Sequence, residues 1–378
     1  MTHDINPAKE LLYQINAGVD EIDFDLVKSG FKHALETECD QRDTSLGSIL
    51  TGLMAKGPKR HEVIALVEAA LSLDGFSPYD EDKPRVELPE GEMLVGALGS
   101  GKKGIKTMNI STPAGLVAAA AGLYFAKPGS SSTSSVTGSA DFMDRVGANI
   151  DIHLEEMIKV IQETRYGFFR IEGLIPNFDE IYGGKFDIPH ALSLVFPALL
   201  SPVALDHLFY GVAHKELELS AQLLEYFRET NFIVSSSTPD GVHYLDELGV
   251  YGTNRIIGKR EDQGRLGKVL CIQPTNEFGL PEYDAEDISP GVTPEENVQY
   301  VINVLAGKGE EARKDIVAIN AGLLLYVGKK ADSPEDGYQL ARAVIEQGTA
   351  IDVLQDFISA TRGDQGKLDA YLAKVPKD

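Results

Sequence analysis

The sequence predicts an α/β protein in which an N-terminal helical lobe joins a larger α/β lobe with a central, mostly parallel sheet and C-terminal helices. Three observations predict this class. Apolar residues recur at helical spacing over residues 1–75, strand-like and helix-like segments alternate after residue 93, and helix start signals return near the C-terminus. A length of 378 residues allows one large α/β domain or two lobes.

Residues 1–75 predict a small antiparallel helical lobe, because the apolar faces are joined by short links. One face carries Leu46, Ile49, Leu50, Leu53 and Met54, and the next carries Val63, Leu66, Val67, Ala70 and Leu71. Residues 76–92 hold three prolines and many charges without a period, so we expect a linker there. We expect part of residues 165–200 to join the helical lobe, which is apolar enough to form a dimer interface.

The segment after the linker alternates between two kinds of pattern. We expect strands at residues 93–98, 123–126, 206–212 and 232–235, and helices at residues 116–121 and 216–227. Such alternation implies a mostly parallel sheet with helices packed on it. Residues 93–378 are therefore predicted to form one α/β domain.

The last part of the chain carries helix-capping signals. The run Thr293-Pro294-Glu295-Glu296 is a capping box with proline at the first helical position. Ser333 followed by Pro334 starts another predicted helix, and Gly348 is placed to end it. These signals predict the C-terminal helices.

Composition excludes several classes of function. Apolar residues make up 43% and charged residues 25%, which is ordinary globular usage. Lys and Arg minus Asp and Glu is 35 − 58, a net charge of −23. Such an acidic chain repels nucleic acid and anionic lipid, and it contains no long basic run. We therefore expect neither a nucleic-acid nor a membrane partner.

The two cysteines, Cys39 and Cys271, form no CxxC pair, so we expect neither a disulfide framework nor structural zinc. The N-terminus lacks the basic-then-apolar layout of a signal peptide, and no apolar run reaches the ~18 residues of a membrane span. The predicted location is the reducing cytosol.

The most informative segment spans residues 94–112. A strand leads into a loop with three glycines, where backbone N–H groups can approach a ligand closely. The predicted helix start, with Thr112 as N-cap and Pro113 in the first turn, offers free N–H groups and a partial positive charge. The loop's charged and glycine positions are Gly99, Gly101, Lys102, Lys103, Gly104 and Lys106. The segment predicts phosphate binding, although its spacing is neither GxxxxGK[ST] nor GxGxxG; the alternative is a solvated lysine-bearing turn.

Three other features are weaker candidates. The polar stretch at residues 129–140 follows a predicted strand, and we expect an ordered ligand-contacting turn rather than a plain linker. The adjacent carboxylates Asp246 and Glu247 could bind Mg²⁺, although many surface turns carry this pair. His190 and His243 lie near these segments, but a lone histidine is more often structural than catalytic.

The combination resembles the anthranilate phosphoribosyltransferase family, within the larger group that includes the pyrimidine nucleoside phosphorylases. The family pattern GTGGDG-x-x-T-x-NIST, an alanine-rich helix, KHGNR-x-x-S and GSAD corresponds here to GSGKKGIKTMNIST, AGLVAAAAG, KPGSSSTS and GSAD. A later LDE, the N-terminal LTGLMAKGPKRHEV and the C-terminal DIVAINAGLLLYVGKKADSPEDG also match. The similarity extends over nearly the whole chain.

The resemblance implies an enzyme, a glycosyltransferase that moves ribose 5-phosphate from phosphoribosyl pyrophosphate (PRPP) to a nitrogen acceptor with Mg²⁺. It also implies a cytoplasmic homodimer joined through the helical lobe. By motif position, the PRPP site comprises Gly99, Ser100, Gly101, Lys102, Lys103, Thr107, Asn109, Ser111, Thr112, Lys127 and Ser139. The implied metal ligands are Ser111, Asp246 and Glu247, and the acceptor positions are Pro128, Ser130 and Lys185.

The departures from the family pattern are chemical. GGD becomes Gly101-Lys102-Lys103, which replaces an acid by a cation near the implied metal and is expected to leave anion binding intact or to strengthen it. KHGN becomes Lys127-Pro128-Gly129-Ser130, so the family's acceptor histidine and asparagine are absent. Lys185 stands near the family's anthranilate-contacting arginine, but lysine cannot form the bidentate fork to a carboxylate.

Three hypotheses follow. The first is a phosphoribosyltransferase whose acceptor need not be anthranilate; with anthranilate it would serve tryptophan biosynthesis. The second is a catalytically silent paralogue that binds a phosphorylated metabolite. The third is a nucleoside phosphorylase. The retained Asn109-Ile110-Ser111-Thr112 and Asp246-Glu247 favour PRPP with a metal, whereas the altered residues 127–131 favour a changed acceptor or silence.

Overall fold

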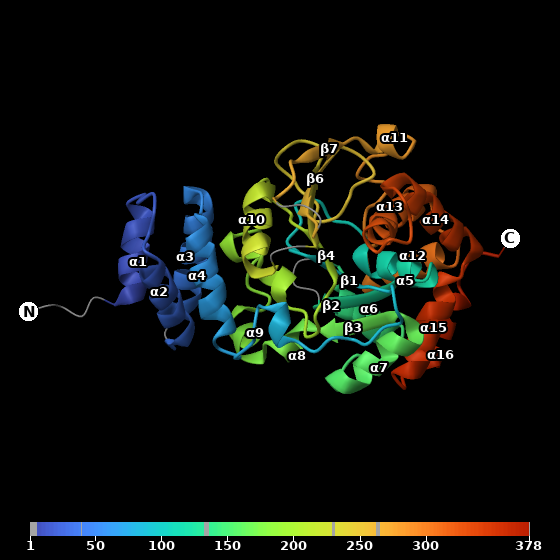
Figure 1. The fold of residues 1–378 in the computed structure, drawn as a ribbon, viewed down its shortest axis with the longest axis horizontal. Helices are drawn as coiled ribbons and strands as arrows, with labels where there is room; N and C mark the ends of the chain where they lie inside the picture. The colour runs from blue at the N-terminus through green and yellow to red at the C-terminus, as the bar shows by residue number, and fades with distance from the viewer. Residues whose placement is uncertain (1–5, 39, 132–135, 229–230, 262–264, 378) are drawn as a thin grey trace, which may run out of the picture.

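The computed structural model describes residues 6–38, 40–131, 136–228, 231–261 and 265–377. Four helices form a lobe at the N-terminal end of the molecule (Figure 1). They are α1 (Pro7–Asn16), α2 (Phe24–Glu36), α3 (Arg42–Lys56) and α4 (Arg60–Leu71). The apolar face predicted for α3 is buried at Leu46, Ile49, Leu50 and Leu53. The division of the chain into domains at residues 76–92 stays a prediction, although that segment holds only the short 3₁₀ turn η1 (Asp80–Asp82) among its described residues.

A seven-stranded sheet forms the centre of the larger lobe, and this confirms the predicted α/β class. Its order is β3 (Tyr166–Arg170), β2 (Tyr124–Gly129), β1 (Leu94–Gly99), β4 (His207–Gly211), β5 (Phe232–Thr238), β6 (Thr253–Lys259) and β7 (Leu270–Ile272). The first five strands are parallel, whereas β6 and β7 are antiparallel additions at one edge.

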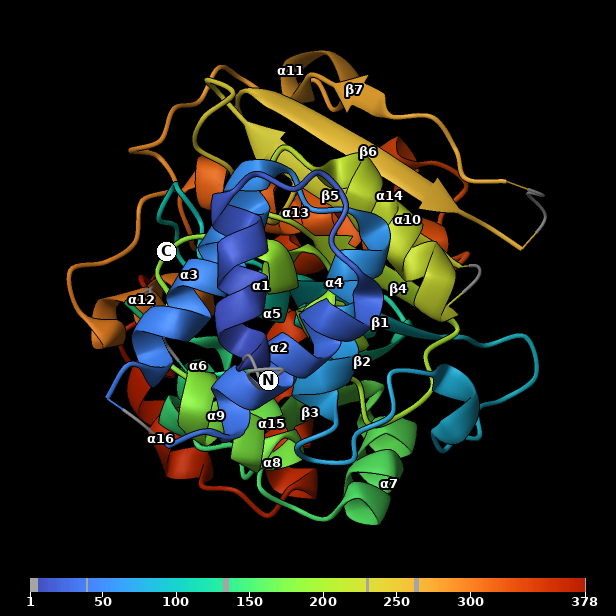
Figure 2. The ribbon, with the colours of Figure 1, turned by 90° about the vertical axis from the view of Figure 1, so that its left-hand side faces the viewer.

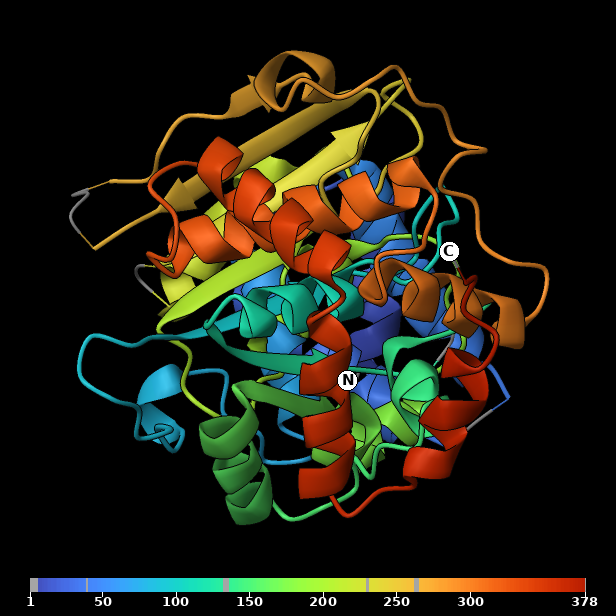
Figure 3. The same cartoon turned by 90° about the vertical axis from the view of Figure 1, so that its right-hand side faces the viewer.

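Helices cover both faces of the sheet. The C-terminal helices pack with α5 (Ser111–Ala120) and α7 (Leu154–Thr164) on one face, as Figure 3 shows. They are α12 (Pro294–Leu305), α13 (Glu311–Val327), α14 (Pro334–Gln347), α15 (Ala350–Ala360) and α16 (Gln365–Leu372). On the other face, α10 (Leu217–Arg228) lies between β5 and α4, and the N-terminal lobe stands in front of it (Figure 2).

Several short elements complete the fold. They are α6 (Ser139–Arg145), α8 (Ile171–Leu174), α9 (Pro176–Tyr182), η2 (Ala191–Leu194), η3 (Phe196–Leu199) and α11 (Pro274–Glu277). The turn η2 packs against α3 and α4. No helix in the described part of the chain is both long and apolar enough to cross a membrane.

The predicted helix caps are confirmed in three of four cases. The Ser333 hydroxyl caps α14 by accepting from Asp336 N at 3.0 Å. The Thr293 hydroxyl accepts from Glu296 N at 3.2 Å, and the Glu296 carboxylate accepts from Thr293 N at 3.3 Å. Gly348 ends α14 in the left-handed conformation, with φ +71°. The prediction that Thr112 caps α5 was wrong, because the helix begins at Ser111 and the Thr112 hydroxyl is buried without a hydrogen-bond partner.

The strand order also locates the point where a ligand is expected. From β1 the chain first moves outward to β2 and β3, and then returns to place β4 on the other side of β1. In such doubly wound sheets, ligands bind outside the carboxyl ends of the strands where the order reverses. Here that point lies between the ends of β1 and β4.

Candidate functional site

The carboxyl ends of β1 and β4 are joined by backbone and side-chain hydrogen bonds. Ser100 N donates to Gly211 O at 2.9 Å, and the Ser100 hydroxyl accepts from Ala213 N at 2.9 Å. Ser100 therefore holds the two strand ends together. Its side chain has this structural partner, and among the predicted PRPP-site residues it is the one that does not line the polar pocket described next.

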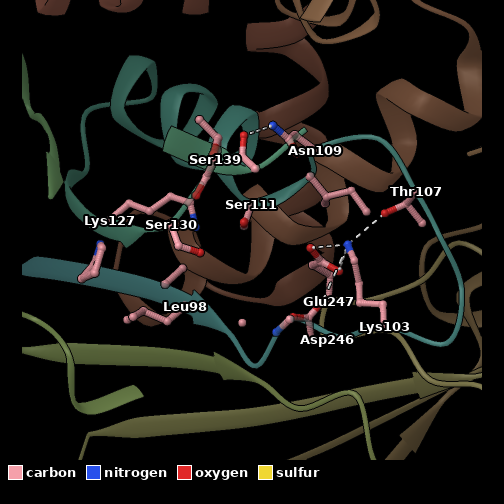
Figure 4. Close-up of a pocket in the computed structure, with 18 of the residues that line it drawn as sticks. Leu98, Lys103, Thr107, Asn109, Ser111, Lys127, Ser130, Ser139, Asp246 and Glu247 are labelled. Atoms are coloured by element: carbon pink, nitrogen blue, oxygen red, sulfur yellow. Dashed lines mark hydrogen bonds and ion pairs between the residues drawn. The ribbon is translucent and has the colours of Figure 1, made fainter. Parts of the chain in front are cut away.

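A polar pocket lies beyond these strand ends, and Figure 4 shows its side chains converging. Its walls include Gly99, Gly101, Lys102, Lys103, Thr107, Asn109, Ser111, Thr112, Lys127, Pro128, Ser130, Ser139, Asp246 and Glu247. The sequence motifs thus come together from β1, the following loop, α5, β2 and residues 245–247. Asn109 Nδ2 also donates to Gly138 O at 3.2 Å, which ties the two loops of the pocket to each other.

Close backbone approach explains the glycines at the strand ends. A Cβ at Gly99 would lie 2.3 Å from Asp246 Oδ2, and a Cβ at Gly211 would lie 1.4 Å from the Asp246 carbonyl oxygen. Gly101 N donates to Asp246 Oδ2 at 2.7 Å. Only glycine allows Asp246 to sit this close to both strands.

Lys103 points at the carboxylate pair. Its ammonium lies 3.2 and 3.1 Å from the two Glu247 carboxylate oxygens, 2.9 Å from Thr107 Oγ1 and 3.7 Å from Asp246 Oδ1. Burial alone would lower the pKa of Lys103, but Glu247 and Asp246 outweigh burial and raise it. The charge of Lys103 is therefore matched by protein carboxylates.

Three further lysines line the pocket. Lys106 is exposed, whereas Lys127 and Lys102 are largely buried. Lys127 is 3% exposed, and burial lowers its pKa to about 8 against the opposing pull of Glu247 and Asp246. Lys102 adopts a left-handed conformation with φ +57°, and its ammonium lies 5.4 Å from the centre of the Tyr182 ring. Burial lowers the pKa of Lys102 to about 8 as well. Neither ammonium makes an ion pair with a described carboxylate, so both can meet an anion.

A second pocket with aromatic walls adjoins the polar one. Its apolar walls come from Phe178, Tyr182, Phe186 and Phe196, and it shares Gly99, Gly101, Lys102, Ser130 and Ile171 with the polar pocket. The rings of Phe178, Tyr182 and Phe186 stack at 4.8 and 5.0 Å between successive centroids. The aromatic pocket therefore fits a flat ring next to whatever the polar pocket binds.

Two carboxyl groups, those of Glu172 and Asp179, line the aromatic pocket. Glu172 Oε1 accepts from Ser131 N at 2.6 Å, while its Oε2 is buried without a described partner. Burial and the neighbouring Glu172 raise the pKa of Asp179. Next to the pocket, the Tyr182 hydroxyl lies 2.7 Å from His190 Nε2, and burial followed by Lys102 lowers the pKa of His190 well below its ordinary value. His190 thus stays neutral.

Not every predicted residue reaches a pocket. Lys185 pairs with Asp43 of α3 at 2.7 Å and lines neither pocket, which corrects its expected place at the acceptor. His243 is exposed and pairs with Asp240. Of the stretch at residues 129–140, residues 129–131 and 137–139 line the polar pocket, and residues 132–135 lie outside the described part. Sequence reasoning missed the aromatic walls, although Phe178, Tyr182 and Phe186 recur every four residues.

The carboxylate pair does not fit a bridging Mg²⁺ in this arrangement. Both Glu247 oxygens are bonded to Lys103, and Asp246 Oδ2 accepts from Gly101 N. Only Asp246 Oδ1 lacks a hydrogen bond, and it lies 3.7 Å from the Lys103 ammonium. Mg²⁺ needs close to six oxygen ligands in octahedral geometry. Across the described residues, no group of three or more His, Cys, Asp or Glu side chains is placed to hold a metal.

The chain is similar to known proteins over most of its length. Residues 91–351 match the family model described as "Glycosyl transferase family, a/b domain". The anthranilate phosphoribosyltransferase of Haloarcula marismortui is 31% identical over 323 residues, which is 85% of this chain and 92% of that protein. The enzyme of the same name from Oceanobacillus iheyensis is 31% identical over 339 residues, 89% of this chain and 93% of that protein.

Solved structures show the same fold. Anthranilate phosphoribosyltransferase from Thermus thermophilus superposes with a TM-score of 0.73 at 24% identity, covering 95% of this chain and all of that one. The Saccharomyces cerevisiae enzyme in complex with PRPP and Mg has a TM-score of 0.74 at 20% identity, covering 94% and 98%.

Proposed function

Because the chain belongs to the anthranilate phosphoribosyltransferase family of glycosyl transferases, we propose that it transfers the 5-phosphoribosyl group of PRPP to a nitrogen atom of a small acceptor. The observation that carries the proposal is the pair of adjoining pockets. The polar pocket offers Lys127, Lys102 and the N-terminus of α5 to phosphate groups. The aromatic pocket offers ring-stacking walls, and the two share Gly99, Gly101 and Ser130.

The proposed reaction forms no covalent bond between the protein and either substrate. The acceptor nitrogen forms a bond to the anomeric carbon, the bond from that carbon to pyrophosphate breaks, and pyrophosphate leaves with the electron pair while the nitrogen loses a proton. Holding donor and acceptor in adjoining pockets can contribute about 7–11 kcal/mol through positioning alone. We assign Lys127 and Lys102 the role of stabilising the charge that develops on the leaving group.

Magnesium enters the proposal with PRPP. When bound, it would neutralise pyrophosphate charge. Ser111 is the protein side chain that would lie beside it, because the Ser111 hydroxyl faces the polar pocket (Figure 4). We further propose that the chain is a cytoplasmic homodimer joined through the helical lobe. Light scattering should then give a mass near twice 41.0 kDa.

We propose an aromatic acceptor that presents N–H donors and lacks a carboxylate. Glu172 and Asp179 line the aromatic pocket, and the buried Glu172 Oε2 is an acceptor without a described partner. An N–H group on the ring would satisfy it, whereas the carboxylate of anthranilate would meet like charge. With Lys185 paired to Asp43, Lys102 is the one described cation that lines the pocket.

A screen for pyrophosphate release tests the proposal. PRPP and Mg²⁺ are combined with aromatic amines, nucleobases and anthranilate, and release is expected with non-carboxylated rings. If anthranilate is the only acceptor in the panel that releases pyrophosphate, the proposed acceptor class is wrong but the transfer reaction is supported. Binding of PRPP without release across the panel would favour a silent PRPP-binding protein, a second candidate raised by the contact between Lys103 and the carboxylates. Failure to bind PRPP would refute both.

A further inference from the structure

We propose that the Lys103 ammonium is the resident counter-ion of the Asp246–Glu247 carboxylate pair, so that this chain binds PRPP without a divalent ion held by the pair. The statement about PRPP binding rests on the proposed function, whereas the statement about Lys103 and the carboxylate pair does not. It concerns one side chain at the position where the family pattern has an acid.

The contacts are those of a fixed cation. An ammonium has three N–H donors, and Lys103 Nζ has Thr107 Oγ1 at 2.9 Å and both Glu247 oxygens at 3.1 and 3.2 Å. Asp246 Oδ1 follows at 3.7 Å. The ammonium therefore lies over the carboxylate pair, as Figure 4 shows, instead of extending toward solvent or into the space for an anion.

Burial makes this counter-ion necessary. Asp246 and Glu247 are 4% and 6% exposed, so water cannot solvate their charge, and the Lys103 side chain is itself 15% exposed. Buried carboxylates need a paired cation or a proton. Lys127 and Lys102 also line the pocket, but neither forms an ion pair with these carboxylates.

The backbone directs Lys103 to the pair. Gly101 and Lys102 both have positive φ, +64° and +57°, and this turns the loop back toward residues 243–247. Gly104 N then donates to Tyr244 O at 3.0 Å, and a Cβ at Gly104 would lie 3.0 Å from His243 Cα. Lys103 thus starts from a backbone held against the segment that carries the carboxylates.

The Lys103 ammonium and a divalent ion cannot both bind the Asp246–Glu247 carboxylate pair. Any ion shared by Asp246 and Glu247 would have to displace Lys103 from both Glu247 oxygens. An ion on Asp246 Oδ1 alone would keep one protein carboxylate ligand and sit beside a positive charge. The geometry therefore assigns the cation role to the protein.

Direct metal binding is the first test, with Mn²⁺ as a paramagnetic substitute for Mg²⁺ at oxygen ligands. Electron paramagnetic resonance of free Mn²⁺ should be unchanged by the wild-type protein without PRPP. Lys103→Met should bind one Mn²⁺ per chain at least about tenfold more tightly. Lys106→Met, which removes the same charge from the same loop, should behave as wild type. Tight binding to the wild type that Asp246→Asn abolishes, or no gain in Lys103→Met, would overturn the proposal.

Calorimetric titration with PRPP is the second test. The gain in PRPP affinity from EDTA to Mg²⁺ should be at least about tenfold smaller for the wild type than for Lys103→Asp, which puts the acid of the family pattern back at this position. A gain as large for the wild type as for Lys103→Asp would refute the inference and leave the proposed function intact. Absence of PRPP binding under both conditions would refute the proposed function, and the Mn²⁺ experiment would still decide the role of Lys103.

Discussion

Burial lowers the pKa of Lys127 and of Lys102, and anion binding in the polar pocket should therefore depend on pH. Both pKa values are about 8, with burial as the main cause. Protonated lysine binds an anion, so PRPP affinity should fall as pH rises through 8, by up to about tenfold per lysine between pH 7.5 and 9. The phosphates of PRPP are ionised throughout that range. Calorimetry across it checks the expectation.

A matched variant separates the lysine from other groups. Lys127→Arg keeps its charge in alkaline solution, so its affinity should lose part of the pH dependence. An unchanged affinity of the wild type from pH 7.5 to 9 would contradict the assignment of these two lysines to the donor.

The pair of Lys103 and Glu247 makes a prediction about stability. Glu247→Gln leaves a buried ammonium without its main partner and should lower the free energy of unfolding by about 3–5 kcal/mol. The double variant with Lys103→Met removes both charges and should recover part of that loss. Urea unfolding of the two single variants and the double variant measures the coupling. Strict additivity of the two single effects would show that the pair contributes no coupling energy.

Residue identity alone could not foresee this contact. The two lysines of GSGKK were expected to favour anion binding, and Lys103 instead faces Glu247, which lies 144 residues further along the chain. Lys185 was placed by a loose alignment, whereas its actual neighbour, Asp43, belongs to α3. Both outcomes depend on long-range packing, which no local pattern encodes.

Among the elements, the close approach of β4 to residues 245–247 is the most sensitive point. Gly211→Ala would place a methyl group 1.4 Å from the Asp246 carbonyl oxygen, so the segment or the strand must shift. We expect a loss of stability of about 1–3 kcal/mol and weakened PRPP binding. Gly173→Ala in α8 meets no atom within 4 Å and serves as control. Thermal unfolding and calorimetry of both variants test the difference; equal behaviour would contradict it.

The sequence predicted the elements well where periodicity was clear. The strands β1, β2, β4 and β5 and the helix α10 were predicted within a few residues, whereas helices were predicted at both ends of the chain without bounds for most of them. The strands β3, β6 and β7 were not predicted, because YGFFR, TNRIIGK and LCI lack strict alternation of apolar and polar residues. The start of α5 was misplaced by two residues, since buried packing of Thr112 outweighed its capping preference.

For the molecule as a whole, the proposed donor PRPP is expected to act as a linked stabiliser. A ligand that binds only the folded state at one hundred times its dissociation constant adds about 2.7 kcal/mol, which for a chain of 378 residues raises Tm by about 3 °C. Differential scanning fluorimetry with and without PRPP measures this shift. Ribose 5-phosphate at the same concentration is the control, because it lacks the pyrophosphate and should shift Tm less.

At this scale the sequence and the structure agree on the helical lobe and on the larger α/β lobe with its mostly parallel sheet, and the residues predicted for the PRPP site stay a prediction. The aromatic pocket could not be derived from the sequence. Its walls come from α9, the turn η3 and the residues between them, which are irregular segments whose course depends on contacts with the N-terminal helices.

The tight contact of Gly211 with Asp246 bears on how such a catalyst can diversify. The backbone of the Asp246–Glu247 carboxylate pair packs against the end of β4, whereas Lys103 belongs to a separate loop. Selection can therefore exchange the loop side chain without moving its anchored counterpart. A lineage could in this way alter its reliance on environmental magnesium through one substitution, while the scaffold and the binding of the sugar donor persist.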